Sequence, residues 1–131
     1  MKLRVRGDSL RFRLTQQEVD RLIAEGRVAE CVRFSPSDAD QLRYTLEASE
    51  TALNVSARFG GGQVIVTVPA RCAAEWAKTD AVGITSTQAI GYGVDLRIAI
   101  EKDFRCLQPR TDEDESDNFP NPEQGPHCAP S

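Results

Sequence analysis

The chain has 131 residues, a formal net charge of −4, 40% hydrophobic residues and 27% charged residues, a composition typical of one globular domain with an appendage. Its opening, MKLRVRGDSL, lacks the apolar stretch of a secretory signal, and no run approaches the roughly 18 apolar residues that a membrane helix requires. We therefore expect a cytoplasmic protein that neither enters nor spans a membrane. Four irregularly spaced cysteines without a CxxC pair are expected to be thiols in that compartment.

The acidity is concentrated near the C-terminal end. Residues 107–131 hold six acids and one arginine, a net charge of −5, so residues 1–106 carry about +1 (−4 minus −5). Five of the seven prolines also lie in this stretch. Because such a shift in composition is typical of a domain boundary, we predict one domain over 1–106 and an acidic, Pro-rich segment over 107–131.

The first part of the chain predicts two pairs of strands around a helix. The expected elements are strands at 2–6 and 10–14, a helix from Thr15 to Gly26, and strands at 28–34 and 42–46, in that order. Gly7 and Asp8 form the first turn. Thr15 and Glu18 have the spacing of a capping box, and Gly26 is suited to end the helix. The order of elements is therefore ββαββ.

The same pattern recurs 54 residues later. The corresponding apolar pairs are Leu10 and Val64, Phe12 and Val66, Leu14 and Val68, Val19 and Ala73, Leu22 and Trp76, Val28 and Val82, Tyr44 and Ile98, and Leu46 and Ile100. Few residues are identical between the halves, but the turns, the helix starts and the apolar positions coincide. We therefore predict two ββαββ units, at 1–48 and 53–101.

Neither unit could bury enough apolar surface alone, so we expect the halves to share one core. The predicted fold class is α+β, with two helices packed against a mainly antiparallel sheet. Eight strands can close into a small barrel or form two facing sheets, and the sequence leaves both arrangements open.

The first hairpin is a candidate binding surface. If its apolar residues face the core, five cations face outward together: Lys2, Arg4, Arg6, Arg11 and Arg13. Their counterparts 54 residues on are Ser56, Arg58, Gly60, Ile65 and Thr67, so the fold itself does not require five cations there. The face is either a solvated surface or a site for an anionic ligand or acidic segment. Nucleic acid is disfavoured because residues 1–106 are nearly neutral and no RNA-binding aromatic pattern is present.

The C-terminal segment is the obvious partner for that face. Its docking residues would be Asp112, Glu113, Asp114, Glu115, Asp117 and Phe119. A tethered segment has an effective concentration on the order of millimolar at its own domain, but surface ion pairs contribute only about 0–1 kcal/mol each. The segment is therefore either a salt-sensitive latch, on this domain or on another protein, or a disordered solubilising tail.

Three residues form a candidate metal site. Cys106, His127 and Cys128 supply the thiolate and imidazole ligands that zinc and other transition metals favour, although their spacing matches no standard zinc finger. Adjacent His and Cys are equally an incidental pair. Because His127 is the only histidine, His-based catalysis within the domain is not expected, and no other cofactor is indicated.

Four stretches resemble a family of small, uncharacterised bacterial proteins: MKLRVRGDSLRFRLTQQEV, AEWAKTD, VGI and EKDFRCLQPRTDEDESDNFPNP…HC. That family has no established activity, so the resemblance implies no catalytic residues. It does imply that the tail motifs and the terminal His-Cys are family features, which favours a docking or metal-binding segment. The expected function is a non-enzymatic accessory or binding protein; the alternative is a metal-binding accessory protein. Neither the partner nor an oligomeric state is indicated.

Overall fold

The computed structural model of the protein describes residues 1–104. The elements are β1 (Lys2–Val5), β2 (Ser9–Leu14), α1 (Gln16–Glu25), β3 (Arg27–Arg33), β4 (Gln41–Ser49), β5 (Ser56–Gly60), β6 (Gln63–Pro69), α2 (Ala70–Lys78), β7 (Gly83–Gly91) and β8 (Val94–Lys102). This order repeats ββαββ twice, which confirms the predicted duplication.

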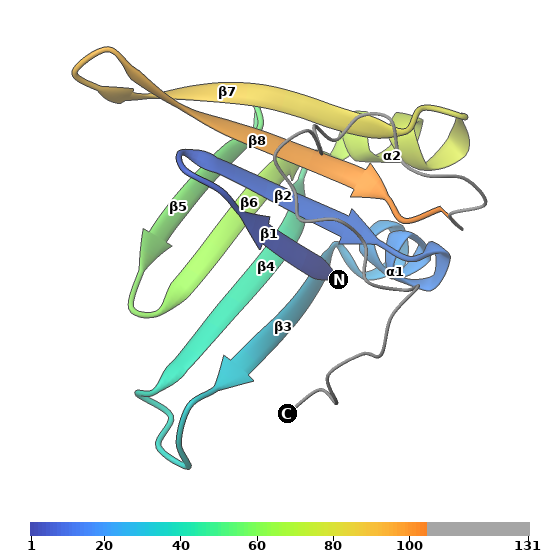
Figure 1. Ribbon diagram of the computed structural model, residues 1–131. Coiled ribbons are helices and arrows are strands. Elements are labelled where there is room, and N and C mark those ends of the chain that lie inside the picture. Colours follow the sequence, from blue (N-terminus) through green and yellow to red (C-terminus); the bar gives the residue numbers. More distant parts are fainter. Residues whose placement is uncertain (105–131) are drawn as a thin grey trace, which may run out of the picture.

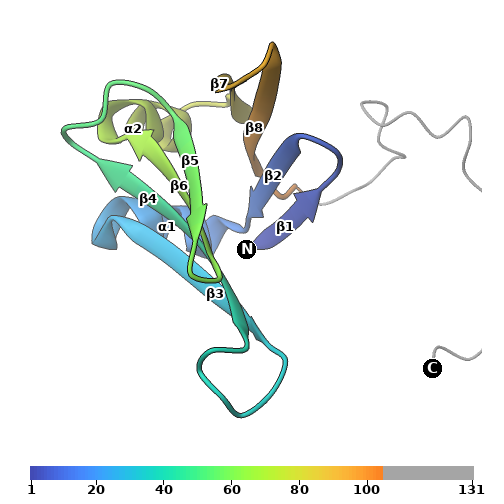
Figure 2. The same ribbon diagram turned by 90° about the vertical axis from the view of Figure 1, so that its left-hand side faces the viewer.

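The eight strands form two four-stranded sheets that face each other (Figures 1 and 2). Sheet A has the order β1-β2-β8-β7, and sheet B has the order β3-β4-β6-β5. Both helices lie at the same end of the two sheets (Figure 1). Of the two predicted arrangements, the structure therefore adopts facing sheets.

Each sheet combines one hairpin from each half of the chain. The hairpins are antiparallel, but the strands where they meet, β2 with β8 and β4 with β6, are parallel. A helix follows the first hairpin of each half, and the second hairpin then lies in the other sheet. The two parallel pairs were not anticipated, because the sequence pattern shows hairpins but not which hairpins become neighbours.

The two parallel pairs have the same register. Leu10 of β2 lies opposite Ile98 of β8, and their counterparts, Val64 of β6 and Tyr44 of β4, lie opposite each other. At the end of each pair, a strand amide donates to the carbonyl of a hairpin turn. The Arg97 amide donates to the Asp8 carbonyl at 2.9 Å in sheet A, and the Arg43 amide donates to the Gly62 carbonyl at 2.8 Å in sheet B. The halves are thus related by an approximate twofold axis between the sheets.

One predicted correspondence is wrong. Val28 and Ile84 occupy equivalent places in their strand pairs, so the counterpart of Val28 is Ile84 and not Val82, whose side chain is 57% exposed. The cause lies at the helix ends. Gly26 has a left-handed φ of 83° and leads directly into β3, whereas α2 ends at Thr79 in an extended conformation. The connection after α2 consequently has four residues, 79–82, against Gly26 alone after α1. Because α2 is also one residue shorter than α1, the second half reaches the equivalent strand position two residues later.

The start of α1 is built as its sequence predicts. The Thr15 hydroxyl accepts a hydrogen bond from the Glu18 amide at 3.3 Å, and the Glu18 carboxylate accepts one from the Thr15 amide at 2.9 Å. The helix buries Val19 and Leu22. This capping box satisfies two amides that the first turn would otherwise leave without partners.

Both sheets and both helices contribute to one core. Its buried apolar residues are Met1, Phe12, Leu14, Val19, Leu22, Val28, Leu46, Val66, Val68, Ala73, Trp76, Ile98 and Ile100. Trp76 is 2% exposed, and its indole nitrogen donates to the Val82 carbonyl at 3.2 Å. The single tryptophan is therefore a core residue, and residues 1–104 share the common core that the prediction required.

The edges of the two sheets are joined by polar contacts. On one side, the Gln88 side chain of β7 bonds to both backbone groups of Ala57 on β5, accepting at 2.7 Å and donating at 2.9 Å. On the other side, the α-amine of Met1, which precedes β1, donates to Glu30 of β3 at 2.8 Å. The Gln88 contact satisfies backbone groups that an open strand edge would expose, and the Met1 contact links the other pair of edges by an ion pair.

We expect Gln88→Ala to lower the free energy of unfolding by about 1–3 kcal/mol, because two hydrogen bonds to a partly buried edge are lost. Chemical denaturation would measure the change. The matched control is Thr87→Ala on the same strand, where an exposed side chain should change stability by no more than about 0.5 kcal/mol. Equal effects of the two variants would show that the contact does not join the sheets.

Candidate functional site

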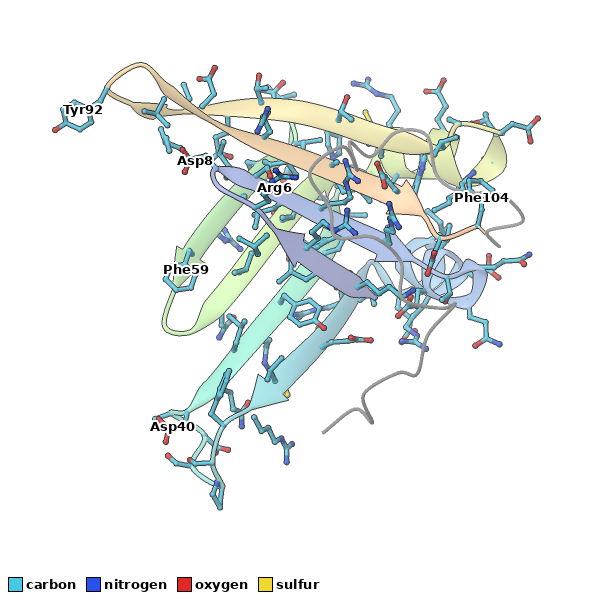
Figure 3. The ribbon with its side chains drawn as sticks, in the orientation of Figure 1. Arg6, Asp8, Asp40, Phe59, Tyr92 and Phe104 are labelled. Atoms are coloured by element: carbon cyan, nitrogen blue, oxygen red, sulfur yellow. The ribbon has the colours of Figure 1, made fainter. Side chains whose placement is uncertain are left out.

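The predicted cationic face lies on the outer surface of sheet A. Phe12 and Leu14 are 1% exposed on the inner side of β2, so the residues that alternate with them point outward. The strand pairing sets Arg4 opposite Arg11 and Lys2 opposite Arg13. The five predicted cations are thus neighbours, and Arg6 lies near the end of the hairpin (Figure 3).

Carboxylates partly neutralise this surface. Lys2 forms an ion pair with Asp103 at 3.0 Å. Arg11 and Arg13 both approach Glu101 of β8, at 3.6 Å and 3.3 Å. Glu101 therefore holds two cations of β2 against β8, and part of the predicted face serves to join the two halves of the chain.

The structure adds Arg97 of β8 to the cationic face, because β8 pairs with β2. Together with Arg6 and Arg11, it lines a hollow of about 780 Å³ on the outer surface of sheet A. The other residues that line the hollow are Ser9, Leu10, Thr85, Ser86, Thr87, Ile98 and Ala99. Neither the Arg6 nor the Arg97 guanidinium forms an ion pair with another residue in 1–104. Three guanidiniums around one hollow make this the candidate anion site.

Sequence reasoning missed Arg97 for an identifiable reason. Alternation along β8 does not show that β8 lies beside β2, and Arg43, the counterpart of Arg97 54 residues earlier, is also an arginine, so comparison of the halves did not single it out. Thr85 and Thr87 gave no signal either, since only the strand order brings β7 to the same surface. The hydroxyls of Thr85 and Thr87 lie near the arginines of β2 and β8 only because these distant strands pair in one sheet.

Charge alone does not distinguish the two outer faces. By strand alternation, and with Arg6 and Asp103 just beyond the strand ends, sheet A presents six cations and three carboxylates. Sheet B presents four arginines and one carboxylate, so each face has a net charge of +3. The hollow described on sheet B is smaller, about 280 Å³, and only Arg58 among its lining residues is charged. The arrangement of cations around a hollow is what singles out sheet A.

A second cluster of ionisable groups surrounds the N-terminal amine. The Met1 ammonium donates to Glu18 and to Glu30, and the Tyr44 hydroxyl donates to Glu30 at 3.0 Å. The Met1 side chain is fully buried and that of Glu18 is 12% exposed. These residues line neither the hollow on sheet A nor the cavity of about 460 Å³, and their bonds join the start of β1 to α1 and β3.

The cluster shifts the pKa values of its members. Burial alone would lower the pKa of the Met1 amine, but the hydrogen bonds and charges of Glu18 and Glu30 together raise it above its ordinary 8.0. Burial alone would raise the pKa of Glu18, but the ammonium and the Thr15 groups together lower it below its ordinary 4.5. Burial and the bond to Glu30 raise the pKa of Tyr44 above its ordinary 10.0.

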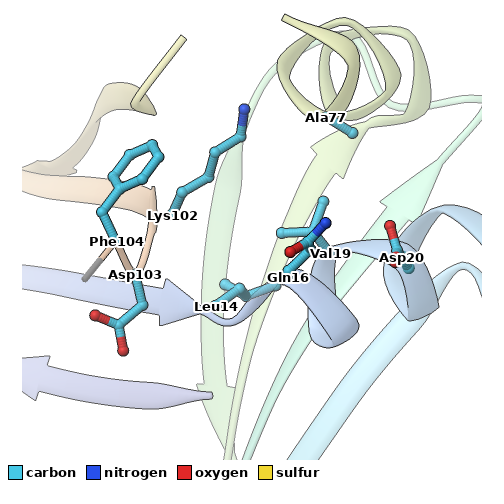
Figure 4. Close-up of a pocket in the computed structure, with 8 residues that line it drawn as sticks. All are labelled: Leu14, Gln16, Val19, Asp20, Ala77, Lys102, Asp103 and Phe104. Carbon is cyan, nitrogen blue, oxygen red and sulfur yellow. The ribbon is translucent and has the colours of Figure 1, made fainter. Parts of the chain in front are cut away.

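A groove of about 460 Å³ lies where α1, α2 and the end of β8 meet (Figure 4). It is lined by Leu14, Gln16, Val19, Asp20, Ala77, Lys102, Asp103 and Phe104. The Lys102 ammonium donates to the Thr79 carbonyl at 2.6 Å and lies 5.7 Å from the centre of the Trp76 ring. Because its cation is already engaged and its acids are separate (Figure 4), the groove offers no concentrated charge to a ligand.

The remaining predicted sites fall outside the described residues. These are the metal candidates Cys106, His127 and Cys128 and the docking candidates Asp112, Glu113, Asp114, Glu115, Asp117 and Phe119. Within residues 1–104, no cluster of three or more potential metal ligands occurs, and Cys31 and Cys72 are free thiols. No helix in that range is long and apolar enough to cross a membrane.

The chain belongs to DUF7009, a family of unknown function whose model matches residues 1–123. This membership confirms the resemblance to an uncharacterised family. The matched range includes the acidic run and FPNP but ends before His127 and Cys128. No curated protein and no solved structure matches the chain.

The N-terminal cluster predicts how stability depends on pH. The lowered pKa of Glu18 contributes stability above pH 4.5 that is lost as the pH falls through its folded-state value, and the raised pKa of Met1 contributes stability below pH 8.0 that is lost as the pH rises through its own. We expect Glu18→Gln to cost about 1–3 kcal/mol near pH 7, and less once acid protonates Glu18 in the wild type.

Chemical denaturation of both proteins across the pH range would measure this difference. Asp20→Asn, on the same helix, is the control and should stay within about 0.5 kcal/mol of the wild type. A Glu18→Gln cost that is the same at acidic and neutral pH would show that the Glu18 charge does not stabilise the fold.

Proposed function

We propose that this protein is a non-enzymatic accessory protein that binds an acidic polypeptide segment on the outer face of sheet A. The binding residues are Lys2, Arg4, Arg6, Arg11 and Arg13, joined by Arg97. The observation that carries the proposal is the hollow of about 780 Å³ that Arg6, Arg11 and Arg97 all line. Guanidinium groups bind carboxylates through paired hydrogen bonds, which makes an acidic segment a suitable ligand.

The cations of this face fall into two groups, those that form ion pairs with carboxylates of the domain and those that do not. Arg11 and Arg13 share Glu101, and Lys2 holds Asp103, so these pairs set the shape of the surface. Arg6 and Arg97 have no such partner within residues 1–104 and are exposed. They can therefore contribute charge to a ligand without first breaking an internal ion pair.

The C-terminal segment supplies an occupant within the same chain. Residues 107–131 carry a net charge of −5, and the described chain leads towards them from β8, a strand of sheet A. In this proposal Asp112, Glu113, Asp114, Glu115 and Asp117 supply the charge and Phe119 the apolar anchor. Docking on the chain's own face and docking on a partner's basic surface are then competing states.

The non-enzymatic assignment rests on the distribution of reactive groups. The shifted pKa values within residues 1–104 belong to Met1, Glu18 and Tyr44, which belong to one hydrogen-bonded cluster that includes Glu30. The only histidine in the sequence is His127. A cytoplasmic location belongs to the same proposal and is supported by the free thiols of Cys31 and Cys72.

A synthetic peptide of residues 110–121, RTDEDESDNFPN, tests the face directly. We expect Arg6→Gln/Arg97→Gln in the full chain to weaken binding about tenfold at low ionic strength, because two exposed ion pairs of up to about 1 kcal/mol each are lost. Fluorescence anisotropy of the labelled peptide would measure it. Binding should disappear near 1 M salt, where the Debye length is about 3 Å.

The matched control is Arg43→Gln/Arg58→Gln, which removes the same charge from the outer face of sheet B. All variants carry Asn or Gln in place of the acids at 112–115 and 117, because a tethered competitor that the same substitutions weaken would mask the difference in peptide affinity. If both double variants lost the same amount of peptide affinity, the effect would come from net charge alone, and this would contradict a site on sheet A. No binding by the wild type would remove the proposed function.

A further inference from the structure

The hollow on sheet A is organised in two rows by the strand pairing. The first row holds Ser9, Arg97 and Thr87, and the second holds Arg11, Ala99 and Thr85. Ala99 has the smallest of these side chains and forms the floor, while Arg6 also lines the hollow. Thr85, Thr87 and Arg97 are exposed, and Ser9, Arg11 and Ala99 are half-buried. Hydroxyl and guanidinium donors therefore surround a small apolar floor.

The equivalent place on sheet B has a different chemistry. Its rows hold Gln63, Arg43 and Cys31, and then Ile65, Thr45 and Ala29. Thr45, the counterpart of Ala99, is 1% exposed, so the centre of that face is filled. The fold thus tolerates a buried side chain larger than alanine at this position, and neither the hydroxyls of Thr85 and Thr87 nor the open floor of sheet A is a structural requirement.

A phosphate group matches this donor set better than a carboxylate. A phosphorylated side chain carries a charge of about −1.5 to −2 near pH 7 and presents three acceptor oxygens, whereas a carboxylate presents two. Guanidinium forks bind two phosphate oxygens at once, and a short hydroxyl can donate to the third. Arg6, Arg11, Arg97, Thr85 and Thr87 supply both kinds of donor, whereas the Ser9 hydroxyl already donates to the Arg6 carbonyl at 2.6 Å.

We propose that the hollow is a phosphate-binding site that recognises a phosphorylated residue within an acidic segment. This inference rests on the proposed function and specifies its ligand. Nucleic acid offers the same phosphate chemistry, but no aromatic residue lines the hollow, so a base finds no stacking platform there. A phosphorylated polypeptide fits the surface better, since its acidic neighbours can contact the surrounding cations.

The test compares two forms of one probe on the full-length protein. The peptide RTDEDESDNFPN is used unmodified and with a phosphate on its serine. We expect the phosphorylated form to bind about tenfold more tightly, because one to three charge-assisted hydrogen bonds are added. Thr85→Val/Thr87→Val should reduce that preference, so that the affinities of the two peptides become more similar, since the variant removes hydroxyls without removing charge.

Further arms separate the sources of the phosphate. Arg97→Gln should reduce the preference, and Arg43→Gln, its counterpart on sheet B, should preserve it; thermal unfolding checks that each variant is folded. Inorganic phosphate should compete with the phosphopeptide only weakly, because it lacks the flanking acids. Competition as strong as that of the phosphopeptide itself would assign the hollow to the free ion instead.

The remaining outcomes distinguish this inference from the function on which it rests. Equal affinities for the two peptides would overturn the phosphate site but leave the acidic-segment proposal standing. Failure of both peptides to bind would overturn both. Tighter binding of a single-stranded oligonucleotide than of the phosphopeptide would overturn the assignment to a polypeptide.

Discussion

The parallel pairing of β2 with β8 and of β4 with β6 is the constraint on which the rest of the structure depends. Each half of the chain supplies one hairpin to each sheet, so neither sheet exists without both halves. The common core, the polar contacts between sheet edges and the candidate anion site all follow from this exchange. Because the two halves are related by an approximate twofold axis, positions on sheet A have counterparts on sheet B. Comparing the two sheets therefore distinguishes residues that the fold requires from residues that are particular to one face.

Local elements were predictable because their signals are local. The capping box at Thr15 and Glu18, the end of α1 at Gly26, the hairpins and most of the core positions appear where the sequence pattern places them. The exchange of hairpins was not predictable, since alternation shows which face of a strand is buried but not which strand lies beside it. The false match of Val28 with Val82 arose because a two-residue shift between helix start and strand leaves the apolar pattern nearly unchanged.

The same distinction applies to the site. The five cations of the first hairpin were predictable from alternation, but their ion pairs with Glu101 and Asp103 were not, because those acids come from the other end of the domain. Arg97, Thr85 and Thr87 were invisible for the same reason. The polar cluster around Met1 depends equally on distant residues, since Glu30 and Tyr44 belong to strands of the other sheet. Polar function in this fold is assembled across the chain rather than within a motif.

The exchange of hairpins also bears on how the chain folds during synthesis. The first hairpin leaves the ribosome early, yet its neighbour in sheet A is β8, whose residues 94–102 are among the last of the domain to be made. Contacts between residues so far apart are expected to form slowly. Until β8 arrives, Phe12 and Leu14 have no neighbouring strand on that side. A truncated chain would therefore lack both the completed sheet and the hollow on its outer face, so ligand binding there would itself report that synthesis had reached the end of the domain.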